Sequence, residues 1–401
     1  MVRQVLFVIT LIQIFWTVLV GVGFLYWLGN ACFAILLIRK VRVLAKLQPD
    51  ELEHLPRVSL IIPACNEAGT LEAPMQSKLR QDYPNLEIIL VDDRSTDGTS
   101  DVVDRIAGND PRVKAVHIAE LPDGWLGKVW ALHTGAGLAS GELLLFSDAD
   151  VYFAPGLVGK AVARFERQGL DQLAVLPEFR SSSFILDIAL ACFIRYLGLG
   201  ARFWEVENPK SGAAMGIGAF NLVRRSFFER TQGFEWMKLE PVDDMALGQV
   251  MKRAGARCSI LNGRDLSWLT WYSSIRQMAN GIERAGFSAF GNFSLARCIL
   301  FGAAILFLEL SPFLALLSVG IPALQAIGVL GMVMALATSV AISRWLNRPI
   351  LPALFVPLGS VLVIWMVMRS GWVGYRRGGI VWRGTLYPTA MFRAGRRVRF
   401  P

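Results

Sequence analysis

A run of apolar residues that contains no charged side chain extends from residue 5 to residue 38. As an α-helix this run would be about 50 Å long, whereas the hydrocarbon core of a bilayer is about 30 Å thick. The run exceeds the apolar segment of a cleavable signal peptide, and no small-residue cleavage site follows it. We therefore predict one long, tilted transmembrane helix within residues 1–40, with an interfacial start near Gln13–Thr17.

A second apolar block begins at Cys298. Basic residues directly after the first run place the chain beyond residue 39 in the cytoplasm under the positive-inside rule. Residues 370–401 also hold seven arginines and no acidic residue, although three full spans would put this tail outside. The proline-rich stretch Pro349–Pro357 makes the last segment the best candidate for a re-entrant or interfacial helix. We predict segments near 298–319, 321–343 and 350–368, which gives membrane or re-entrant helices over 298–369 and a basic tail over 370–401.

The composition agrees with a membrane protein that carries one soluble domain. Charged residues make up 18% of the chain and hydrophobic residues 54%, whereas a soluble domain has about 25% charged residues. Five cysteines without a C-x-x-C pair, and three histidines without ligand-like spacing, argue against a disulfide framework, a structural zinc site and a His-rich metal site. The net charge of +9 comes from arginines beside the apolar segments, so nucleic acid is not an expected partner.

Two places in the apolar regions carry charge and leave alternatives open. Glu309 lies inside an apolar run, where it would face the helix bundle or a polar substrate path, or else end a helix beside Ser311-Pro312. Phe184–Gly200 is apolar and aromatic, but Asp187 and Arg195 make it a poor membrane span. It fits either an interfacial helix that presents an acceptor or a buried core helix.

Residues 51–297 hold most of the acidic residues and alternate between two kinds of segment. Short β-branched runs such as Leu86–Asp92 alternate with helix-like runs such as Thr99–Ala107. This alternation predicts right-handed βαβ units and an α/β domain with a mainly parallel sheet. Ligands of such sheets bind beyond the carboxyl ends of the strands.

Acidic pairs follow two of the predicted strands. Asp92 and Asp93 close the first, and two acids there suit hydrogen bonds to a nucleotide base or ribose; equally, they could simply form a turn or cap a helix. Asp148 and Asp150 close the strand ELLLFS. Their carboxylates could hold Mg²⁺ or Mn²⁺ together with diphosphate oxygens, and this cation would neutralise charge on a leaving diphosphate.

A third acidic pair, Asp243-Asp244, precedes a helix-like run. It suits a general base that takes a proton from an attacking hydroxyl, or a pair of acids at a helix N-terminus. Lys128 follows a glycine-rich loop near a helix start, where it would pair with phosphate or remain solvated. Gly216 and Gly218 permit a close backbone approach, which suits a sugar or acceptor pocket or merely tight packing.

Four ordered motifs together resemble those of family 2 glycosyltransferases, which have the GT-A fold. The resemblance covers residues 57–290, and the opening motif IIPACNE departs from the family at Cys65, where Tyr or Arg is more usual. Two further segments resemble a membrane-bound branch near hopanoid-biosynthesis-associated and carotenoid glycosyltransferases. The four motifs are IIPACNE (61–67), VDDRSTDGT (91–99), DAD (148–150) and PVDDMALGQVMKRAG (241–255).

The resemblance implies a Rossmann-like GT-A domain over residues 51–297, on the cytoplasmic side and flanked by transmembrane helices. It implies that Asp150 binds Mg²⁺ or Mn²⁺, that Asp148 supports the metal, the sugar or the diphosphate, and that Asp244 is the catalytic base with Asp243 beside it. The donor-binding residues would include Lys128. The residues that the resemblance assigns to the nucleotide are Pro63, Asn66, Glu67, Asp92 and Asp93.

The expected function is therefore an inverting transfer of one sugar from a nucleotide-diphosphate sugar to a lipid acceptor. The acceptor would be hopanoid-, carotenoid- or polyprenyl-like, and the enzyme would be a multi-pass protein of the inner (plasma) membrane. The family's Q-x-x-R-W acceptor motif is absent, and Trp271–Phe287 stands in its place. This absence favours single-sugar transfer over a processive polysaccharide synthase, and the intact acidic pairs argue against a non-catalytic scaffold.

Overall fold

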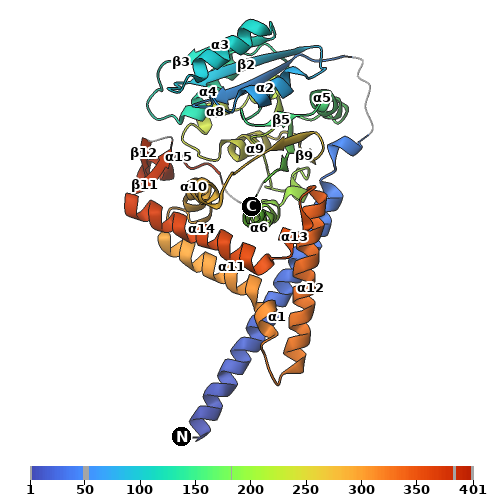
Figure 1. Ribbon diagram of the computed structural model, residues 1–401, viewed down its shortest axis with the longest axis vertical. Helices are drawn as coiled ribbons and strands as arrows, with labels where there is room; N and C mark the ends of the chain where they lie inside the picture. Colours follow the sequence, from blue (N-terminus) through green and yellow to red (C-terminus); the bar gives the residue numbers. More distant parts are fainter. Residues whose placement is uncertain (1, 48–53, 182, 383–384, 399–401) are drawn as a thin grey trace. The chain divides into compact units, whose positions relative to one another are not determined.

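The computed structural model describes residues 2–47, 54–181, 183–382 and 385–398 (Figure 1). The chain divides into two compact units, and each is assembled from three separate segments. We call them the helical unit and the sheet unit. The helical unit comprises Met1–Arg39, Ser181–Gly200 and Tyr272–Thr389, and the sheet unit comprises Lys40–Arg180, Ala201–Trp271 and Ala390–Pro401.

Seven strands form the main sheet of the sheet unit. They are β1 (Val58–Ala64), β2 (Leu86–Asp93), β3 (Val113–Ile118), β4 (Leu143–Phe146), β6 (Gln172–Leu176), β8 (Asn221–Arg224) and β9 (Cys258–Asn262). Their order is β3-β2-β1-β4-β8-β6-β9. Only β8 runs antiparallel to its neighbours, β4 and β6. The predicted mainly parallel α/β sheet is confirmed.

The central strands are apolar throughout because helices cover the sheet. All seven residues of β1 and all four of β4 are buried, as expected for parallel strands with both faces covered. Helix α4 packs on β1 and β2, and α3 packs on β2 and β3. The helices of this unit are α2 (Glu72–Leu79), α3 (Thr99–Asn109), α4 (Gly127–Leu138), α5 (Leu157–Arg167), α7 (Arg225–Phe228), α8 (Gly233–Trp236) and α9 (Asp243–Arg253).

Smaller elements complete the sheet unit. A second sheet has the order β5-β10-β7, in which β10 runs antiparallel to β5 and parallel to β7. Its strands are β5 (Tyr152–Phe153), β7 (Glu178–Phe179) and β10 (Ser267–Leu269), and two short 3-10 helices are η1 (Leu44–Lys46) and η2 (Phe203–Glu205).

The C-terminal segment returns to the sheet unit through α15 (Thr389–Gly395). The buried carboxylate of Glu240 accepts hydrogen bonds from the backbone N–H groups of Arg397 and Val398, at 2.8 and 3.0 Å. The Arg397 guanidinium donates to the Trp236 carbonyl at 2.9 Å. The part of the predicted basic tail from residue 390 to residue 398 is therefore an ordered part of the sheet unit.

Five helices of the described chain are long and apolar enough to cross a membrane, so the chain is a membrane protein. The candidate spans correspond to α1 (Val2–Lys40), α6 (Phe184–Gly200), α11 (Leu295–Ala315), α12 (Pro322–Trp345) and α14 (Val356–Arg377), and the second of them continues beyond α6 to Glu205. Around them lie α10 (Ile275–Ala285), the π-helix η3 (Gly286–Phe290), α13 (Ile350–Ala353) and the antiparallel hairpin of β11 (Gly379–Trp382) and β12 (Thr385–Pro388).

The last long helix differs from the expected apolar stretch 350–368. It starts at Val356 and continues to Arg377, and the short helix α13 precedes it. The prolines of this stretch explain the late start, since proline lacks an N–H and is tolerated only in the first turn of a helix. Pro357 occupies that first turn in α14.

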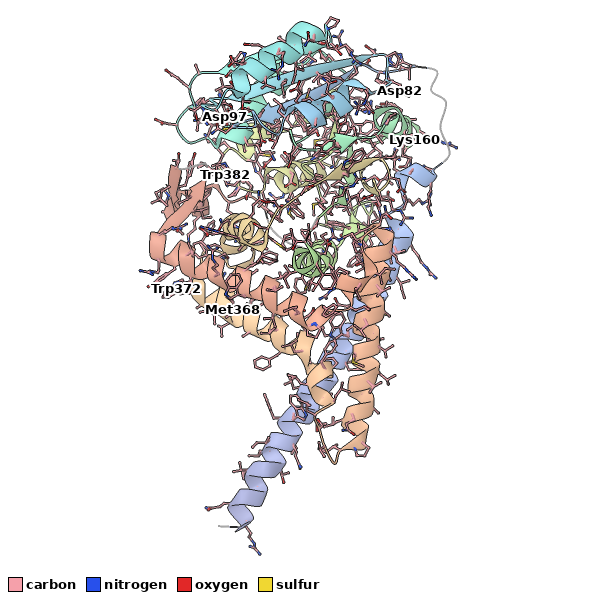
Figure 2. The ribbon with its side chains drawn as sticks, viewed as in Figure 1. Asp82, Asp97, Lys160, Met368, Trp372 and Trp382 are labelled. Atoms are coloured by element: carbon pink, nitrogen blue, oxygen red, sulfur yellow. The ribbon has the colours of Figure 1, made fainter. Side chains whose placement is uncertain are left out.

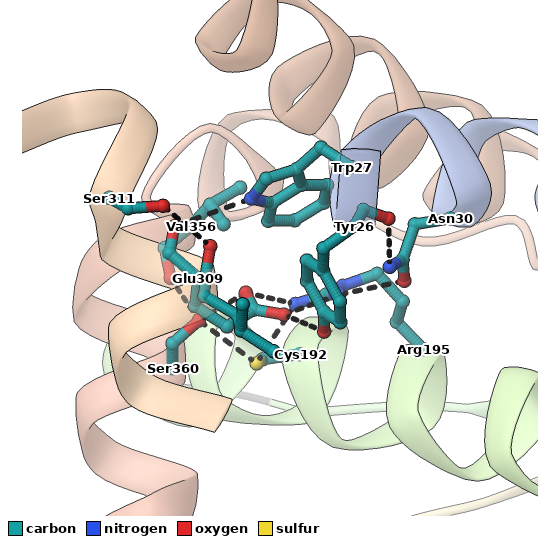
Figure 3. A network of polar contacts seen from close by, with 10 residues as sticks. Tyr26, Trp27, Asn30, Cys192, Arg195, Glu309, Ser311, Val356 and Ser360 are labelled. Atoms are coloured by element: carbon teal, nitrogen blue, oxygen red, sulfur yellow. Dashed lines mark hydrogen bonds and ion pairs between the residues drawn. The ribbon is translucent and has the colours of Figure 1, made fainter. Parts of the chain in front are cut away.

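Glu309 faces the interior of the helical unit (Figure 3). Its carboxylate forms two hydrogen bonds with the Arg195 guanidinium, at 3.0 and 2.7 Å, and accepts further hydrogen bonds from Tyr26 and Ser360. The Glu309 and Arg195 side chains are 0% and 1% exposed. Of the alternatives for Glu309, the bundle-facing one is confirmed, and the residue links α1, α6, α11 and α14.

Candidate active site

The predicted site residues gather where β1, β2 and β4 end. These three strands are parallel neighbours, so their carboxyl ends share one edge of the sheet. Asn66 and Glu67 follow β1, Asp92 and Asp93 end β2, and the Asp148–Asp150 segment follows β4. This edge is where an open α/β sheet binds its ligands.

Asp92 is buried and held by the turn that follows it. One carboxylate oxygen accepts from the Ser95 N–H at 3.3 Å, and the other contacts the Ser100 hydroxyl and the His117 ring. Burial alone would raise the pKa of this carboxyl, but these hydrogen bonds outweigh it and hold the pKa below its usual value. Asp92 is therefore an ionised carboxylate that shapes the turn after β2.

Asp93 lies closer to the start of α4. Its carboxylate accepts from the Arg94 guanidinium at 2.8 Å, and its side chain is 0% exposed. A Cβ atom added at Gly127 would collide with this carboxylate and would lie 2.6 Å from the Arg94 guanidinium. Glycine at 127 thus lets the first turn of α4 approach the end of β2.

The loops after β1 and β2 are tied together by hydrogen bonds. The Asn66 side chain accepts from the Thr96 N–H at 2.8 Å, and the Glu67 N–H donates to Thr99 Oγ1 at 2.8 Å. The Asn66 side chain is exposed, whereas Pro63 is buried within β1, where it is paired with Val91. Of these predicted nucleotide-binding residues, Asn66 is the most accessible to a ligand.

Lys128 connects the DAD segment to the third acidic pair. Its ammonium lies 2.8 Å from Asp148 Oδ1 and 3.1 Å from Asp243 Oδ2. Burial by itself would lower the pKa of Lys128, but the carboxylates of Asp148, Asp243 and Asp244 raise it above its usual value. Lys128 is therefore a fixed positive charge between carboxylates rather than a solvated side chain. Its pairing with a donor phosphate stays a prediction.

Asp244 occupies the first turn of α9, and its carboxylate points back to the segment before β8. One oxygen accepts from the Gly218 N–H at 3.0 Å and the other from the Met245 N–H at 2.8 Å. The Gly218 carbonyl in turn accepts from the Asp148 N–H at 2.8 Å. Gly218 thus links the backbone of the DAD segment directly to the Asp244 carboxylate.

The pKa of Asp244 is raised to about 7, chiefly by burial and next by the neighbouring Asp243 carboxylate, while Lys128 opposes the shift. The pKa of Asp243 is also raised, again first by burial. A carboxyl group with a pKa near neutrality can both accept and release a proton at physiological pH. Asp244 therefore has the electrostatic properties that a general base requires.

The two glycines before β8 allow this close arrangement. A Cβ atom added at Gly218 would lie 2.5 Å from Asp148 Oδ2, and one added at Gly216 would collide with the Asp244 carbonyl. Gly248 of α9 packs against the same segment, since its Cβ position lies 2.5 Å from the Gly216 nitrogen. These glycines bring α9 and the DAD segment together, and a larger residue at Gly216 or Gly218 would displace an acidic residue.

A cavity of about 20 Å³ lies between these groups, room for one or two water molecules. Polar groups from both sides line it. They include Lys128, Ser147, Asp148, Gly218, Asn221, Asp243 and Asp244. The cavity thus brings together residues between positions 128 and 247 that lie far apart in the sequence.

Lys78 of α2 lies beneath the DAD segment, a position that no motif in the sequence indicates. Its ammonium donates to the carbonyls of Asp148, Ala149 and Val151, the first two at 3.2 and 3.4 Å. The side chain is fully buried, and burial lowers the pKa of Lys78 to about 7 although Asp150 and Asp148 act in the opposite direction. A single lysine in a helix-like run usually has a solvated side chain, so the sequence does not predict that Lys78 is buried.

The carboxylate of Asp150 is the kind of group that a divalent cation would bind. Burial raises the pKa of Asp150 to about 6, the Asp148 carboxylate raises it further, and Lys78 opposes them. Among the described residues no cluster of three or more His, Cys, Asp or Glu side chains is arranged to enclose a metal. One or two carboxylates fit a Mg²⁺ or Mn²⁺ ion that takes its other ligands from substrate phosphates and water.

Comparisons with known proteins relate this arrangement to other chains. Residues 59–231 match the family described as "Glycosyl transferase family 2". The chondroitin synthase of Pasteurella multocida (strain Pm70) is 31% identical over 124 residues, which are 31% of this chain and 12% of that protein. The 4,4'-diaponeurosporenoate glycosyltransferase of Staphylococcus haemolyticus (strain JCSC1435) is 23% identical over 226 residues, 56% of this chain and 59% of that protein.

The fold is shared with a solved structure, the mannosyltransferase PcManGT from Pyrobaculum calidifontis in complex with GDP-Man and Mn²⁺. The TM-score is 0.52 at 20% sequence identity, and the alignment covers 90% of this chain and 98% of that chain. This likeness confirms the GT-A-like fold expected for the sheet unit. The matches to the curated relatives named above span 12% and 59% of those proteins, less than two thirds of either.

Proposed function

We propose that this chain, whose residues 59–231 match family 2 of the glycosyltransferases, transfers one sugar from a nucleotide-diphosphate sugar to a lipid acceptor. The observation that carries the proposal is that Lys128 and Gly218 join two acidic segments, Asp148–Asp150 and Asp243-Asp244. The first segment suits the donor diphosphate, and Asp244 in the second suits the attacking hydroxyl. A displacement at a sugar carbon requires both at once.

In the proposed mechanism the acceptor hydroxyl oxygen attacks the anomeric carbon of the donor sugar. Asp244 takes the hydroxyl proton as the new carbon–oxygen bond forms, and later releases it to water. The bond from the sugar to the diphosphate breaks, and the nucleoside diphosphate leaves with the bonding electrons. Attack opposite the leaving group inverts the configuration of the anomeric carbon.

The remaining residues hold the donor in place. Asp93 and Asn66 lie at the ends of β2 and β1, where the base and ribose of a nucleotide would bind, while Asp92, Glu67 and Pro63 support the same loops. Mg²⁺ or Mn²⁺, held by Asp150 with Asp148, would neutralise charge on the leaving diphosphate. The Mn²⁺ and GDP-Man in the structure of PcManGT support this choice of ligands.

The helical unit is the reason for proposing a lipid acceptor and a membrane location. Five apolar helices keep the chain in a membrane, and the basic residues after α1 favour a cytoplasmic sheet unit on the inner (plasma) membrane. The match to a 4,4'-diaponeurosporenoate glycosyltransferase supports a carotenoid-, hopanoid- or polyprenyl-like acceptor.

The test is product analysis with purified protein in native lipid extract. Labelled UDP-, GDP- and dTDP-sugars are offered with Mg²⁺ or Mn²⁺, and the wild type is compared with Asp150→Ala. Asp82→Asn, a change of an exposed acid away from the strand ends, is the matched control. We expect a labelled glycolipid from the wild type and the control only. No product with any donor, from folded protein that binds none of the nucleotides, would contradict the proposal.

A processive polysaccharide synthase is the second candidate, and two relatives favour it. A chondroitin synthase and a hyaluronan synthase of Pasteurella multocida are each 31% identical over 124 residues. Product length separates the two functions in the same assay. A long insoluble glycan, instead of a lipid that carries one sugar, would establish the synthase.

A further inference from the structure

Residues 233–240, which include α8, contact each part of the candidate active site. The Leu126 N–H, at the start of α4, donates to the Lys238 carbonyl at 2.8 Å. The Phe234 ring packs edge-on against Phe146, the last residue of β4, with ring centroids 5.2 Å apart, and it also lines the cavity between the acidic segments. The same stretch leads along the chain into α9. A displacement of residues 233–240 would therefore disturb the start of α4, the end of β4 and the start of α9.

The C-terminal segment of the sheet unit packs closely on this stretch. A Cβ atom added at Gly395 would lie only 2.6 Å from the Leu239 Cβ atom, so the backbone there lies directly against Leu239. Phe392 and Val398, on either side of this contact in the sequence, are 1% and 2% exposed. Residues 392–398 are therefore a packed part of the sheet unit.

Trp236 contacts both this segment and α9. The Arg397 guanidinium donates to the Trp236 carbonyl at 2.9 Å and lies 5.9 Å from the centre of the Trp236 ring. The Arg253 guanidinium, at the end of α9, lies 4.9 Å from the same ring. A guanidinium over the face of a tryptophan is attracted to the ring electrostatically. These contacts join the C-terminal segment, α8 and α9.

Glu240 connects the C-terminal segment to the start of α9 by hydrogen bonds. One carboxylate oxygen accepts from the N–H groups of both Arg397 and Val398, and the Val242 backbone is hydrogen-bonded to the same carboxyl. The Val242 carbonyl in turn accepts from the Ala246 N–H in the first turn of α9, at 3.0 Å. Glu240 is only 2% exposed, and a buried carboxylate that loses its donors is strongly unfavourable.

We propose that residues 392–398 form a clasp that positions the acidic pair Asp243-Asp244, and that Glu240 is the positioning residue through which the clasp acts. In the sequence the clasp follows the helical unit and lies outside residues 59–231, which match the family. The chain therefore completes its active site with a segment that the family match does not include. The inference rests on the proposed function in that Asp244 is taken as the base.

Four variants of the full chain test the clasp. Gly395→Val should force the clasp away from Leu239, and Ala394→Val, at the neighbouring exposed position, is the matched control. Arg397→Met is a milder change that removes the donor to the Trp236 carbonyl. Arg397→Lys restores a charged donor at the same position and should recover part of any loss.

Hydrogen exchange measures the positioning of the acidic pair without reference to catalysis. The reporters are the Gly218 and Met245 N–H groups, because both donate to the Asp244 carboxylate. The internal reference is β2 with the turn that follows it, where Asp97 lies (Figure 2). We expect Gly395→Val to speed exchange at the reporters about tenfold or more by local opening, and to leave the reference unchanged. The control Ala394→Val should change neither.

Transfer assays then show whether positioning limits the reaction. We expect Gly395→Val to lower kcat about 10–100-fold, the effect of a small misplacement of a catalytic group, while the KM for the donor stays close to that of the wild type. Arg397→Met should show a smaller loss of kcat, part of which Arg397→Lys recovers. Ala394→Val should transfer sugar at the wild-type rate.

Unchanged exchange at the reporters in Gly395→Val would overturn the proposal. Equally fast exchange at the reporters and at β2 would also overturn it, since the clasp would then stabilise the whole sheet unit instead of positioning one segment. If Gly395→Val does not fold, Arg397→Met decides by the same two readouts. If the wild type transfers no sugar from any donor, the proposed function fails, whereas the exchange comparison still decides whether the clasp positions the acidic pair.

Discussion

At the scale of residues, the main feature of the site is a group of carboxyls around one ammonium. Asp148, Asp243 and Asp244 surround a single ammonium, that of Lys128. Burial first, and then the Asp243 carboxylate, raises the pKa of Asp244 to about 7, while Lys128 opposes the shift. Changes of the charges beside Asp244 should therefore move the pH at which the proposed base becomes active.

The first prediction concerns the pH dependence of transfer. The base must be ionised, so kcat/KM should rise as the pH increases through about 7. Asp243→Asn removes a negative neighbour, which favours the ionised form of Asp244 and should move this rise to lower pH. Lys128→Met removes the positive neighbour and should move it to higher pH. Rate profiles of both variants check the signs; shifts in the same direction would exclude Asp244 as the titrating group.

The second prediction concerns Lys78, a positioning residue beneath the DAD segment. Lys78→Met keeps the length of the side chain but leaves three carbonyls without their donor. We expect the concentration of Mn²⁺ needed for half-maximal activity to rise about 10–100-fold, the usual effect of losing a group that orients metal ligands. Lys114→Met, an exposed change on β3, is the control. An unchanged metal requirement with a uniformly lower kcat would indicate a different role.

The sequence predicts the location of a site residue correctly where that location depends only on the end of a strand. The acids after β2 and β4 were found because parallel strands end at one edge of the sheet. The sequence does not predict the partners of Lys128 or the burial of Lys78, since both depend on packing between segments far apart in the sequence. Pairing across such distances leaves no periodic signal in one chain.

At the scale of elements, the start of α4 shows how close packing positions the donor site. Gly127 lets this helix approach Asp93 and Arg94, whereas Gly137, near the other end of the same helix, has open space at its Cβ position. Both glycines have ordinary helical backbone angles, so alanine is tolerated by the backbone at either position. Only the surroundings of the two glycines differ.

The third prediction follows from this pair. Gly127→Ala should displace the Asp93 carboxylate and raise the KM for the donor roughly tenfold, because overpacking costs about 1–3 kcal/mol. Gly137→Ala should leave the KM unchanged and slightly stabilise the helix. Donor titrations of the two variants measure the difference. An equal effect of both changes would show that α4 acts only through helix stability.

Most elements of the sheet unit could be predicted because their apolar patterns are short and bounded by turns. Strand β2, expected over Leu86–Asp92, occupies Leu86–Asp93. The last apolar helix could not be placed as well, since its prolines shift the start to Val356 and its arginines look like a tail rather than a helix end. The turn chemistry of prolines, rather than hydropathy, sets that boundary.

At the scale of the whole molecule, the chain combines a sheet unit of GT-A-like fold with a helical unit that contains a buried ion pair. Arg195 and Glu309 lie on different helices, and both are almost fully buried. Removing one partner of a buried ion pair leaves an uncompensated charge, which typically costs about 3–5 kcal/mol, while replacing both partners by apolar residues costs far less.

The fourth prediction uses this asymmetry. Glu309→Gln should lower the free energy of unfolding in detergent by about 3 kcal/mol or more. Arg195→Met combined with Glu309→Met should recover much of that loss, as measured by thermal or denaturant unfolding of the purified chain. If the double variant is less stable than Glu309→Gln, the pair stabilises the unit by more than the cost of burying its charges.

The most direct test of the proposed chemistry compares the wild type with Asp244→Asn under single-turnover conditions, with bound labelled donor and native lipid. Asparagine keeps the size of the side chain and its hydrogen bond from Gly218 but cannot take a proton. We predict that donor binding is retained and that formation of the labelled lipid falls about 100-fold or more. Glycolipid formation at the wild-type rate by Asp244→Asn would contradict the role of Asp244 as the base.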